Sequence, residues 1–443
     1  MSKEIDLLIS GCLAVTVNDE FSIIENAGIA INNGKIIAID KVENISTEIY
    51  KPRKIIFAAN KMAIPGLVNA HTHAAMVYFR GLADDLPLKE WLENHIWPAE
   101  AKYVNAEFIR KAIRLAVAEM LKSGTTIFCD MYFLPDIAAE VLEEMKIKAI
   151  LGSPLLDSKT PITKSPKEGL KNTENLIKKL RGGSGRIMPA VAPHAPYTCS
   201  SELLKQAAEI SKEYDVPFHI HLSEEEWENK KIESEKGMSS IAYLNNLGVL
   251  TEKTIAAHVN WVSTHDIEIL KEAGAGVVHN PQSNMKLATG ICPVPDLLKA
   301  GVKVGLGTDG ATSNNDLDMF GEMQTAARLH KIARKDPTAV NAKEAIWMAT
   351  KGGAKVLGLD ETIGSLEANK KADIVLLDMD KPHLVPLYDV HSQLAYSVKG
   401  SDVDTVIIDG RTVVENGDLL VCDEEKIISE ARTFSRKLKG ASF

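Results

Sequence analysis

The chain has 443 residues, of which 45% are hydrophobic, and a formal net charge of -9 at pH 7. This length and hydrophobic content allow a large core, divided over two or three domains or gathered in one barrel with an appended domain. The acidic balance argues against nucleic acid or an anionic membrane as the main partner, and the sequence contains no apolar run long enough to span a membrane.

The N-terminus and the cysteines indicate the compartment. The stretch Met1–Asp6 is charged and lacks the apolar core of a signal peptide. The cysteines are scattered along the chain without a Cys-x-x-Cys spacing, at Cys12, Cys129, Cys199, Cys292 and Cys422. We therefore expect reduced, mostly packed thiols in a cytoplasmic protein.

Both ends of the chain have the pattern of β structure. Near the N-terminus we expect short strands at 5–9, 13–17, 27–31 and 35–39. Asn33-Gly34, between the last two, predicts a tight hairpin. Near the C-terminus we expect strands at 373–377, 405–408 and 412–415, with turns at Asp409-Gly410 and Asn416-Gly417 and a last helix over 424–439. We expect the two ends to form one small β-sandwich domain.

Between these ends, apolar strands alternate with amphipathic helices. One helix is expected over 106–122, with Asn105 as its N-cap, and another over 202–213, opened by Ser200-Ser201. Eight strands are expected, at 62–69, 125–131, 148–155, 187–193, 217–222, 254–258, 275–279 and 303–308.

Such an alternation predicts an α/β fold with a parallel sheet, and eight strand–helix units favour a (β/α)8 TIM barrel. A doubly wound open sheet is the alternative. We place the barrel at residues 63–364, the first part of the β-sandwich domain at 1–62, and its second part, with the C-terminal helix, at 365–443.

Ionisable residues gather where these strands end. His71 and His73 end the first strand with a spacing of two, which turns both side chains to the same side. Taken alone they could be structural histidines, but other strands end in similar residues: Asp130, His194, His219, His221, Glu224, His258, His279 and Asp309. In a (β/α)8 barrel the active site lies at this face, so we expect most of them to converge there. We expect His219 to point away from His221, and His279 to hold the Asn280-Pro281 loop.

A metal centre accounts for this cluster. His71, His73, His221 and Asp309 would supply three neutral nitrogens and one carboxylate, which suits zinc first and iron or cobalt second. An open position would hold a water, whose pKa such a cation lowers to about 7. The fourth strand ends in His194 rather than in a lysine that could be carboxylated, which favours one metal ion per chain.

At this point the sequence is recognisable. It resembles the amidohydrolase superfamily and, within it, the methylthioadenosine/S-adenosylhomocysteine deaminases and their chlorohydrolase relatives. The motifs that carry the resemblance are IPGLVNAHTH (64–73), RGLADDLPLKEWL (80–92), APHAPYTCS (192–200), HIHLSE (219–224), HNPQSNMKLATG (279–290), GTDGATSNN (307–315) and GSLEANKKADIVLLD (364–378). One departure is Asn369, where the family usually has glycine; asparagine also tolerates the left-handed backbone conformation.

The resemblance implies hydrolytic deamination of adenine nucleosides at a single divalent metal, Zn2+ or else Fe2+. Carried over by motif, His71, His73, His221 and Asp309 hold the metal. Glu224 relays protons to N1 of the purine, and His258 and Asp309 take the proton from the metal-bound water. Glu100 accepts hydrogen bonds from the ribose hydroxyls, His194 contacts the substrate, and Ser313 lines the site. The resemblance also favours a homo-oligomer.

The favoured substrate is 5′-methylthioadenosine, converted to 5′-methylthioinosine and ammonia, with S-adenosylhomocysteine or adenosine as further substrates. Apolar residues suit the methylthio group, namely Met76, Phe79, Leu86 and Trp91. Relatives that use S-adenosylhomocysteine well are expected to carry arginine near the end of the third strand. The segment 147–169 has no arginine. Lys159 and Lys164 are the cations of this segment that could replace one.

Two other functions remain open at this stage. One is an aminohydrolase or chlorohydrolase of another heteroaromatic ring, of the guanine or triazine type, although a carboxylate for ribose at Glu100 would then lack a purpose. The other is a non-catalytic protein that kept the barrel for assembly. We expect the segment 222–236, beyond Glu224, to be a solvated helix face.

Overall fold

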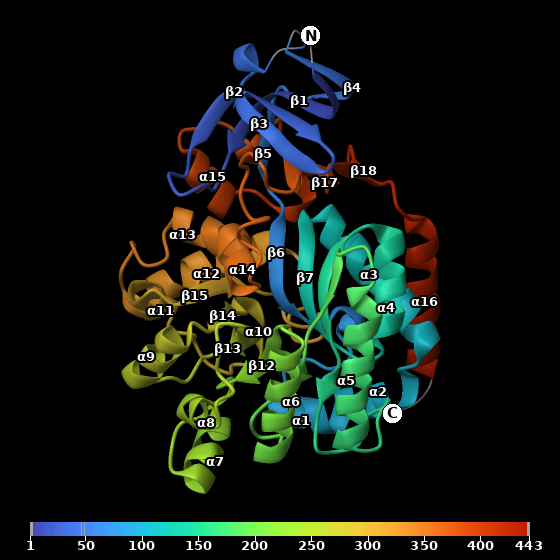
Figure 1. Cartoon of the computed structure of the whole chain (residues 1–443), viewed down its shortest axis with the longest axis vertical. Helices are drawn as coiled ribbons and strands as arrows, with labels where there is room; N and C mark the ends of the chain where they lie inside the picture. Colours follow the sequence, from blue (N-terminus) through green and yellow to red (C-terminus); the bar gives the residue numbers. More distant parts are fainter. Residues whose placement is uncertain (1–2, 46, 48, 441–443) are drawn as a thin grey trace.

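The computed structural model describes residues 3–45, 47 and 49–440 (Figure 1). The strands are β1 (Lys3–Val15), β2 (Ile23–Asn32), β3 (Lys35–Lys41), β4 (Tyr50–Phe57), β5 (Lys61–Pro65), β6 (Leu67–Thr72), β7 (Thr125–Met131), β8 (Lys148–Gly152), β9 (Pro154–Leu155), β10 (Ile187–Pro189), β11 (Ala192–Pro193), β12 (Phe218–Leu222), β13 (Thr254–His258), β14 (Gly276–His279), β15 (Lys303–Leu306), β16 (Ile374–Asp378), β17 (Val403–Ile408), β18 (Arg411–Glu415) and β19 (Asp418–Leu419).

The α-helices are α1 (Leu88–Trp91), α2 (Trp97–Tyr103), α3 (Ala106–Lys122), α4 (Pro135–Met145), α5 (Pro166–Arg181), α6 (Ser201–Glu213), α7 (Glu226–Lys236), α8 (Ser240–Asn246), α9 (Thr264–Ala273), α10 (Pro281–Lys286), α11 (Val294–Ala300), α12 (Met319–Arg334), α13 (Ala342–Trp347), α14 (Gly353–Val356), α15 (Val390–Tyr396) and α16 (Glu424–Gly440). Short 3-10 or π turns are η1 (Val42–Asn44), η2 (Ala74–Phe79), η3 (Leu92–Ile96), η4 (Met348–Gly352), η5 (Pro382–Leu384) and η6 (Gly400–Asp402). None of the described helices is long and apolar enough to cross a membrane.

Strands from the two chain ends share one nine-stranded sheet at one end of the molecule (Figure 1). Its order is β19-β18-β17-β16-β5-β1-β2-β3, and β4 also pairs with β1. β5 is the seam, because it pairs in parallel with β1 and antiparallel with β16. The predicted association of the two chain ends is therefore confirmed. Their strands pair in one continuous sheet, and this pairing does not show the expected β-sandwich.

The remaining strands form parallel sheets. Their orders are β10-β8-β7-β6 and β12-β13-β14-β15, with β9 paired to β11. Two isolated parallel bridges, Val191 to Phe218 and Thr72 to Asp309, link one sheet to the other on both sides. All these strands therefore run the same way, and their carboxyl ends lie away from the nine-stranded sheet (Figure 1).

The turn between β5 and β6 fixes the start of the strand that leads to His71 and His73. Gly66 interrupts the single strand that we expected over 62–69. A Cβ atom on Gly66 would lie 2.1 Å from Oγ1 of Thr126, so only glycine allows this close approach. The Gly66 N–H donates to the carbonyl oxygen of Asp373 at 2.9 Å, which ties the start of β6 to the nine-stranded sheet.

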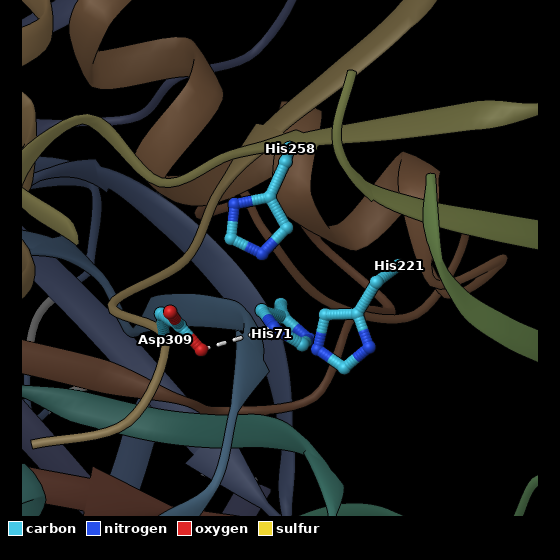
Figure 2. Close-up of side chains that lie close together, drawn as sticks. All are labelled: His71, His221, His258 and Asp309. Carbon is cyan, nitrogen blue, oxygen red and sulfur yellow. Dashed lines mark ion pairs between the residues drawn. The ribbon is translucent and has the colours of Figure 1, made fainter. Parts of the chain in front are cut away.

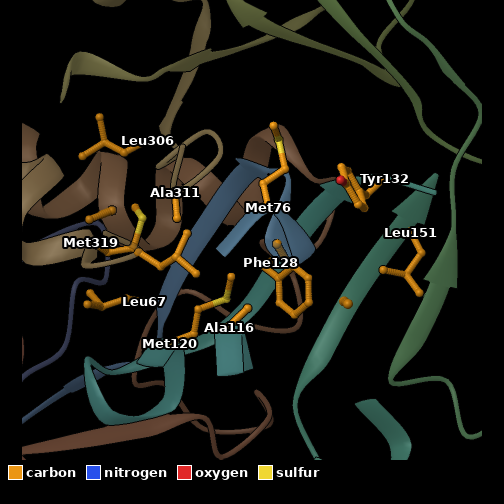
Figure 3. Packing of buried hydrophobic residues seen from close by; sticks show 14 of the residues in the cluster. Leu67, Met76, Ala116, Met120, Phe128, Tyr132, Leu151, Leu306, Ala311 and Met319 are labelled. Atoms are coloured by element: carbon orange, nitrogen blue, oxygen red, sulfur yellow. The ribbon is translucent and has the colours of Figure 1, made fainter. Parts of the chain in front are cut away.

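Apolar side chains fill the space between the strands and the covering helices (Figure 3). Leu67 and Phe128, on β6 and β7, belong to one buried cluster with Ala116 and Met120 of α3. Met319, at the start of α12, joins the same cluster. Because these packed layers fix the strands, the residues that end each strand are held in defined positions.

Several local predictions are confirmed. β7, β13 and α3 have the expected bounds, and the side chain of Asn105 accepts from the backbone N–H groups of Glu107 and Phe108. Asn33 and Gly34 have φ values of 50° and 74°, as a two-residue hairpin turn requires. Asn369 has a φ of 74°, so it occupies the left-handed conformation. The five cysteines are unpaired, and four are buried.

Other predictions are wrong in detail. The strands expected at 5–9 and 13–17 are one strand, β1, and β4 was not expected at all. Pro52 and three cationic residues hide the strand pattern of β4, whose partner is the parallel β1. The strands expected at 148–155 and 187–193 are each divided in two, at Ser153 and at residues 190–191.

A buried ion pair joins the nine-stranded sheet to the parallel strands, and it gives a first prediction. Nζ of Lys148, at the start of β8, lies 2.7 Å from Oδ2 of Asp373 and 2.9 Å from Oδ1 of Asp409. Lys148→Met leaves the buried Asp373 carboxylate without its nearest cation, which lowers the free energy of unfolding by about 3–5 kcal/mol.

Chemical denaturation of variant and wild type measures this loss. The control is Lys179→Met, since that lysine is half exposed and 3.5 Å from Glu140; its free energy of unfolding should change by less than about 0.5 kcal/mol. Equal unfolding midpoints for Lys148→Met and the wild type would contradict a stabilising role for the pair.

Candidate metal centre and active site

The backbone brings the ends of β6 and β15 together. Thr72 and Asp309 form the bridge between these strands, and the hydroxyl of Thr72 donates to the carbonyl oxygen of Asp309 at 2.7 Å. The Asp309 N–H donates to the carbonyl oxygen of His71 at 3.0 Å. Residues that are more than 200 positions apart in the sequence therefore meet with a fixed register.

Four side chains converge at this point. Oδ1 of Asp309 lies 3.3 Å from Nε2 of His71 and 3.2 Å from Nε2 of His73. The Nε2 atoms of His73 and His221 are 3.1 Å apart. Ligand atoms on a tetrahedral zinc ion, with bonds of about 2.0–2.1 Å, are roughly 3.3 Å from one another. These separations therefore fit a metal ion between the four expected ligands.

The rings are turned so that unprotonated nitrogens face one another. Nδ1 of His73 donates to the carbonyl oxygen of Met131, and Nδ1 of His221 to that of His194, each at 2.7 Å. The lone pairs of the two Nε2 atoms are thereby left to oppose each other at 3.1 Å. Nε2 of His71 is buried and has no hydrogen-bond partner among the described residues. A cation would accept the lone pairs of all three Nε2 atoms, so this set of nitrogens fits a metal ion.

Asp309 is held by its second oxygen. Oδ2 accepts hydrogen bonds from the hydroxyls of Ser283 at 2.7 Å and Ser313 at 2.8 Å. Ser313 was expected near the site; Ser283 was not, although it lies inside the motif at 279–290.

His258 adds a further nitrogen to the centre. Its side chain belongs with His71, His221 and Asp309 to a group whose nearest ligand atoms all lie within 4.8 Å of one another (Figure 2). Nδ1 of His258 donates to Oδ1 of Asn284 at 2.8 Å, which leaves Nε2 free to act as a base. Burial lowers the pKa of His258, so its ring is neutral at neutral pH.

Glu224 lies beside this group. It is buried, with Oε1 3.8 Å from Nδ1 of His258. Burial, followed by the charge of Asp309, raises the pKa of Glu224 well above its usual value. Burial therefore favours the uncharged form of this carboxyl group, and a carboxylic acid can give a proton to a ring nitrogen.

The helix face after Glu224 is not wholly solvated, and that expectation is wrong. Glu228 is fully buried, and its two carboxyl oxygens accept from the N–H groups of Ser223 at 3.3 Å and Glu224 at 3.0 Å. Burial, followed by the neighbouring Glu224, raises the pKa of Glu228 to about 8. Glu228 thus anchors the turn that carries Glu224.

Two further histidines lie outside the expected ligand set. The Nε2 atom of His219, which we expected to point away from His221, lies 2.8 Å from Nδ1 of His71, on the opposite side of that ring from Asp309. His219 therefore fixes the ring orientation of His71, one of the expected metal ligands. The Nε2 atom of His279 lies 3.1 Å from Nε2 of His330, and its expected role in holding the Asn280-Pro281 loop stays a prediction.

A cavity opens in front of the cluster. Its walls include the expected residues His73, Trp91, Glu100, His194, His221, Glu224, His258, Asp309 and Ser313. Burial raises the pKa of Glu100 to about 7, and Tyr132, a residue that we did not anticipate, lines the same cavity. Nδ1 of His194 lies 3.0 Å from Oγ1 of Thr198.

The apolar wall differs in part from the expectation. Met76 and Trp91 line the cavity, whereas Phe79 and Leu86 do not. Phe79 is fully buried and stacks on Phe108 at a ring distance of 5.0 Å. No lysine or arginine is among the described residues that line this cavity.

Known proteins share this architecture. The model of the amidohydrolase family matches residues 62–413. The 5-methylthioadenosine/S-adenosylhomocysteine deaminase 1 of Syntrophus aciditrophicus (strain SB) is 42% identical over 437 residues, 99% of this chain and 98% of the relative. The 5′-deoxyadenosine deaminase of Methanosarcina acetivorans is 44% identical over 436 residues, 98% of each chain. The crystal structure of an adenosine deaminase from Xanthomonas campestris with bound zinc is 35% identical, with a TM-score of 0.97 and 100% of both chains covered.

These similarities extend over nearly the whole chain and include both chain ends, which contribute strands to the nine-stranded sheet. They agree with the motifs between residues 64 and 378, and they confirm the resemblance inferred from those motifs. The residues around Asp309 supply the nitrogen and carboxylate ligands that a metal-dependent hydrolase needs. The chain belongs to the amidohydrolase family.

Proposed function

We propose that this protein is a metal-dependent aminohydrolase that removes ammonia from adenine nucleosides. One observation carries the proposal: Glu224 and His258 line the same cavity as Glu100 and three of the candidate metal ligands, namely His73, His221 and Asp309. Burial raises the pKa of Glu224 and lowers that of His258, as an acid and a base in one site require. Its relatives include a 5-methylthioadenosine/S-adenosylhomocysteine deaminase and a 5′-deoxyadenosine deaminase, which supports the nucleoside class.

His71, His73, His221 and Asp309 would hold one Zn2+ ion, with Fe2+ as the second choice. When bound, the ion supplies a Lewis acid that activates water for attack on the purine. The contacts of His71 with His219, and of Asp309 with Ser283 and Ser313, keep the ligands in position.

The other side chains move protons. Glu224 gives its proton to N1 of the adenine ring, so that C6 becomes a better electrophile. His258 accepts a proton at Nε2 from the attacking water, assisted by Asp309, and returns it to the amine that leaves C6. The remaining hydroxyl proton at C6 passes to Glu224 as the carbonyl forms, which restores the acid. The net reaction consumes water and releases ammonia and the inosine nucleoside.

The remaining cavity residues would position the substrate. Glu100, with its pKa raised to about 7, accepts hydrogen bonds from the ribose hydroxyls. His194 and Ser313 lie beside the reacting ring, and Trp91 contributes apolar surface. A ribose contact favours nucleosides over free guanine or triazine rings, for which Glu100 would have no partner.

We place this site on a (β/α)8 barrel at residues 63–364, completed by a β domain from residues 1–62 and 365–443. The two bridges that link the parallel sheets support closure of the barrel. We further propose a cytoplasmic homo-oligomer. The net charge of -9 supports a protein that uses neither nucleic acid nor a membrane surface as its partner.

The ligand assignment predicts that His221→Ala loses metal and turnover together, because the variant keeps too few ligands on one side of the ion. Elemental analysis of the purified protein and ammonia release from 5′-methylthioadenosine measure both. His265→Ala is the control, since this exposed histidine lies outside the cavity. Full metal occupancy in His221→Ala would refute the assignment.

The proton relay predicts that Glu224→Gln binds metal normally but loses turnover by about 10²–10⁴-fold, because an amide cannot pass a proton to N1. Steady-state kinetics with parallel metal analysis tests this. Glu225→Gln changes the neighbouring carboxylate, which does not line the cavity, and should retain activity. Turnover by Glu224→Gln at the wild-type rate would be inconsistent with the relay.

Lysine and arginine are absent from the described residues that line the cavity, and this absence predicts the order of substrates. 5′-Methylthioadenosine should have a kcat/KM about tenfold to a hundredfold above that of S-adenosylhomocysteine, because no arginine is in place to pair with its carboxylate. Lys159 and Lys164 are exposed and do not line the cavity. Kinetics on these two nucleosides and adenosine decide the matter, and an equal or higher kcat/KM for S-adenosylhomocysteine would contradict the order.

A further inference from the structure

A second hollow adjoins the active-site cavity, and we call it the outer groove. Its walls come from α1, η3, α2 and α7 and from the loop after β11. Leu88, Leu92, Trp97 and Tyr197 line both hollows, so the outer groove continues from the cavity. Figure 1 shows α1, α2 and α7 at the end of the molecule opposite the nine-stranded sheet, where the parallel strands end.

The outer groove lies where the 5′ end of a bound nucleoside would point. Trp97 and Glu100 are three residues apart on α2, which places them on the same face of that helix. If Glu100 holds the ribose hydroxyls and the base lies against Glu224, the sugar carbon left to point outward is C5′. A group attached there would pass Trp97 and enter the outer groove.

The walls suit a thioether chain. The rings of Tyr197 and Trp227 meet edge to face, with centroids 4.8 Å apart, and Trp97 is 37% exposed. Sulfur makes favourable contacts with aromatic rings, so these residues can hold a sulfur-containing substituent at C5′.

The outer groove carries both signs of charge. Glu93 and Lys231 of α7 both line it, and Glu93 lies 4.0 Å from Nζ of Lys89, which lines it too. Lys231 makes no ion pair among the described residues. An α-amino acid group presents one carboxylate and one ammonium, which match Lys231 and Glu93 respectively.

We propose that the outer groove binds the 5′ substituent of the nucleoside and that Lys231 recognises the carboxylate of an amino-acid tail. This inference rests on the proposed deamination of adenine nucleosides. It assigns the task of the missing arginine to α7 instead of the segment 147–169, whose Lys159 and Lys164 line neither hollow. A lysine pairs with a carboxylate less firmly than arginine, in keeping with S-adenosylhomocysteine as the poorer substrate.

The test compares Lys231→Ala with the wild type, both loaded with metal. kcat/KM should fall about threefold to tenfold for S-adenosylhomocysteine and change less than about twofold for 5′-methylthioadenosine, because only the former carries a carboxylate. Lys231→Arg should restore the ratio. Lys230→Ala is the matched control: this neighbouring lysine pairs with Glu226 at 2.9 Å and does not line the outer groove.

Product binding separates this proposal from the proposed function. Calorimetric titration with S-inosylhomocysteine and 5′-methylthioinosine needs no turnover, and Lys231→Ala should weaken only the former. Equal affinities of wild type and Lys231→Ala for S-inosylhomocysteine would overturn the role of Lys231. Failure of the wild type to deaminate any adenine nucleoside would instead overturn the proposed function, while the binding result would still decide the outer groove.

Discussion

The site depends on the contacts that surround the buried carboxylate of Asp309. A buried negative charge is costly unless positive groups or hydrogen bonds surround it. Here one oxygen faces His71 and His73, and the other accepts from Ser283 and Ser313. The bridge of Asp309 to Thr72 also joins β6 to the chain after β15, so the carboxylate of the candidate metal centre lies where the two parallel sheets meet.

Hydrogen bonds also orient the side chains around Asp309. Backbone carbonyls of Met131 and His194 fix the two rings that oppose each other, and His219 fixes the third. Glu228 performs the corresponding task for the acid Glu224 by accepting from its backbone N–H. The chemistry thus rests on groups that are already oriented, which reduces the reorganisation needed during reaction.

The sequence predicted the residues that strand periodicity places at the site, and it failed where tertiary packing decides. His71 lies near the end of the buried strand β6, while His73 and Asp309 follow β6 and β15, and the carboxyl ends of parallel strands share one edge. Ser283 and Glu228 carry no such signal: Glu228 lies in a charged helix without apolar periodicity, and its burial depends on the turn at Ser223. β4 was missed because its pairing with β1, and not its composition, makes it a strand.

The most direct test of this account is an anomalous-difference map from crystals of the zinc-loaded protein. His73 and His258 compete for the third nitrogen position, since His258 also lies near His71, His221 and Asp309. Our account predicts one peak at about 2.0–2.2 Å from Nε2 of His71, His73 and His221 and Oδ1 of Asp309, with Nε2 of His258 left as a base. A peak bonded to His258 in place of His73, or no peak within this cluster, would contradict it.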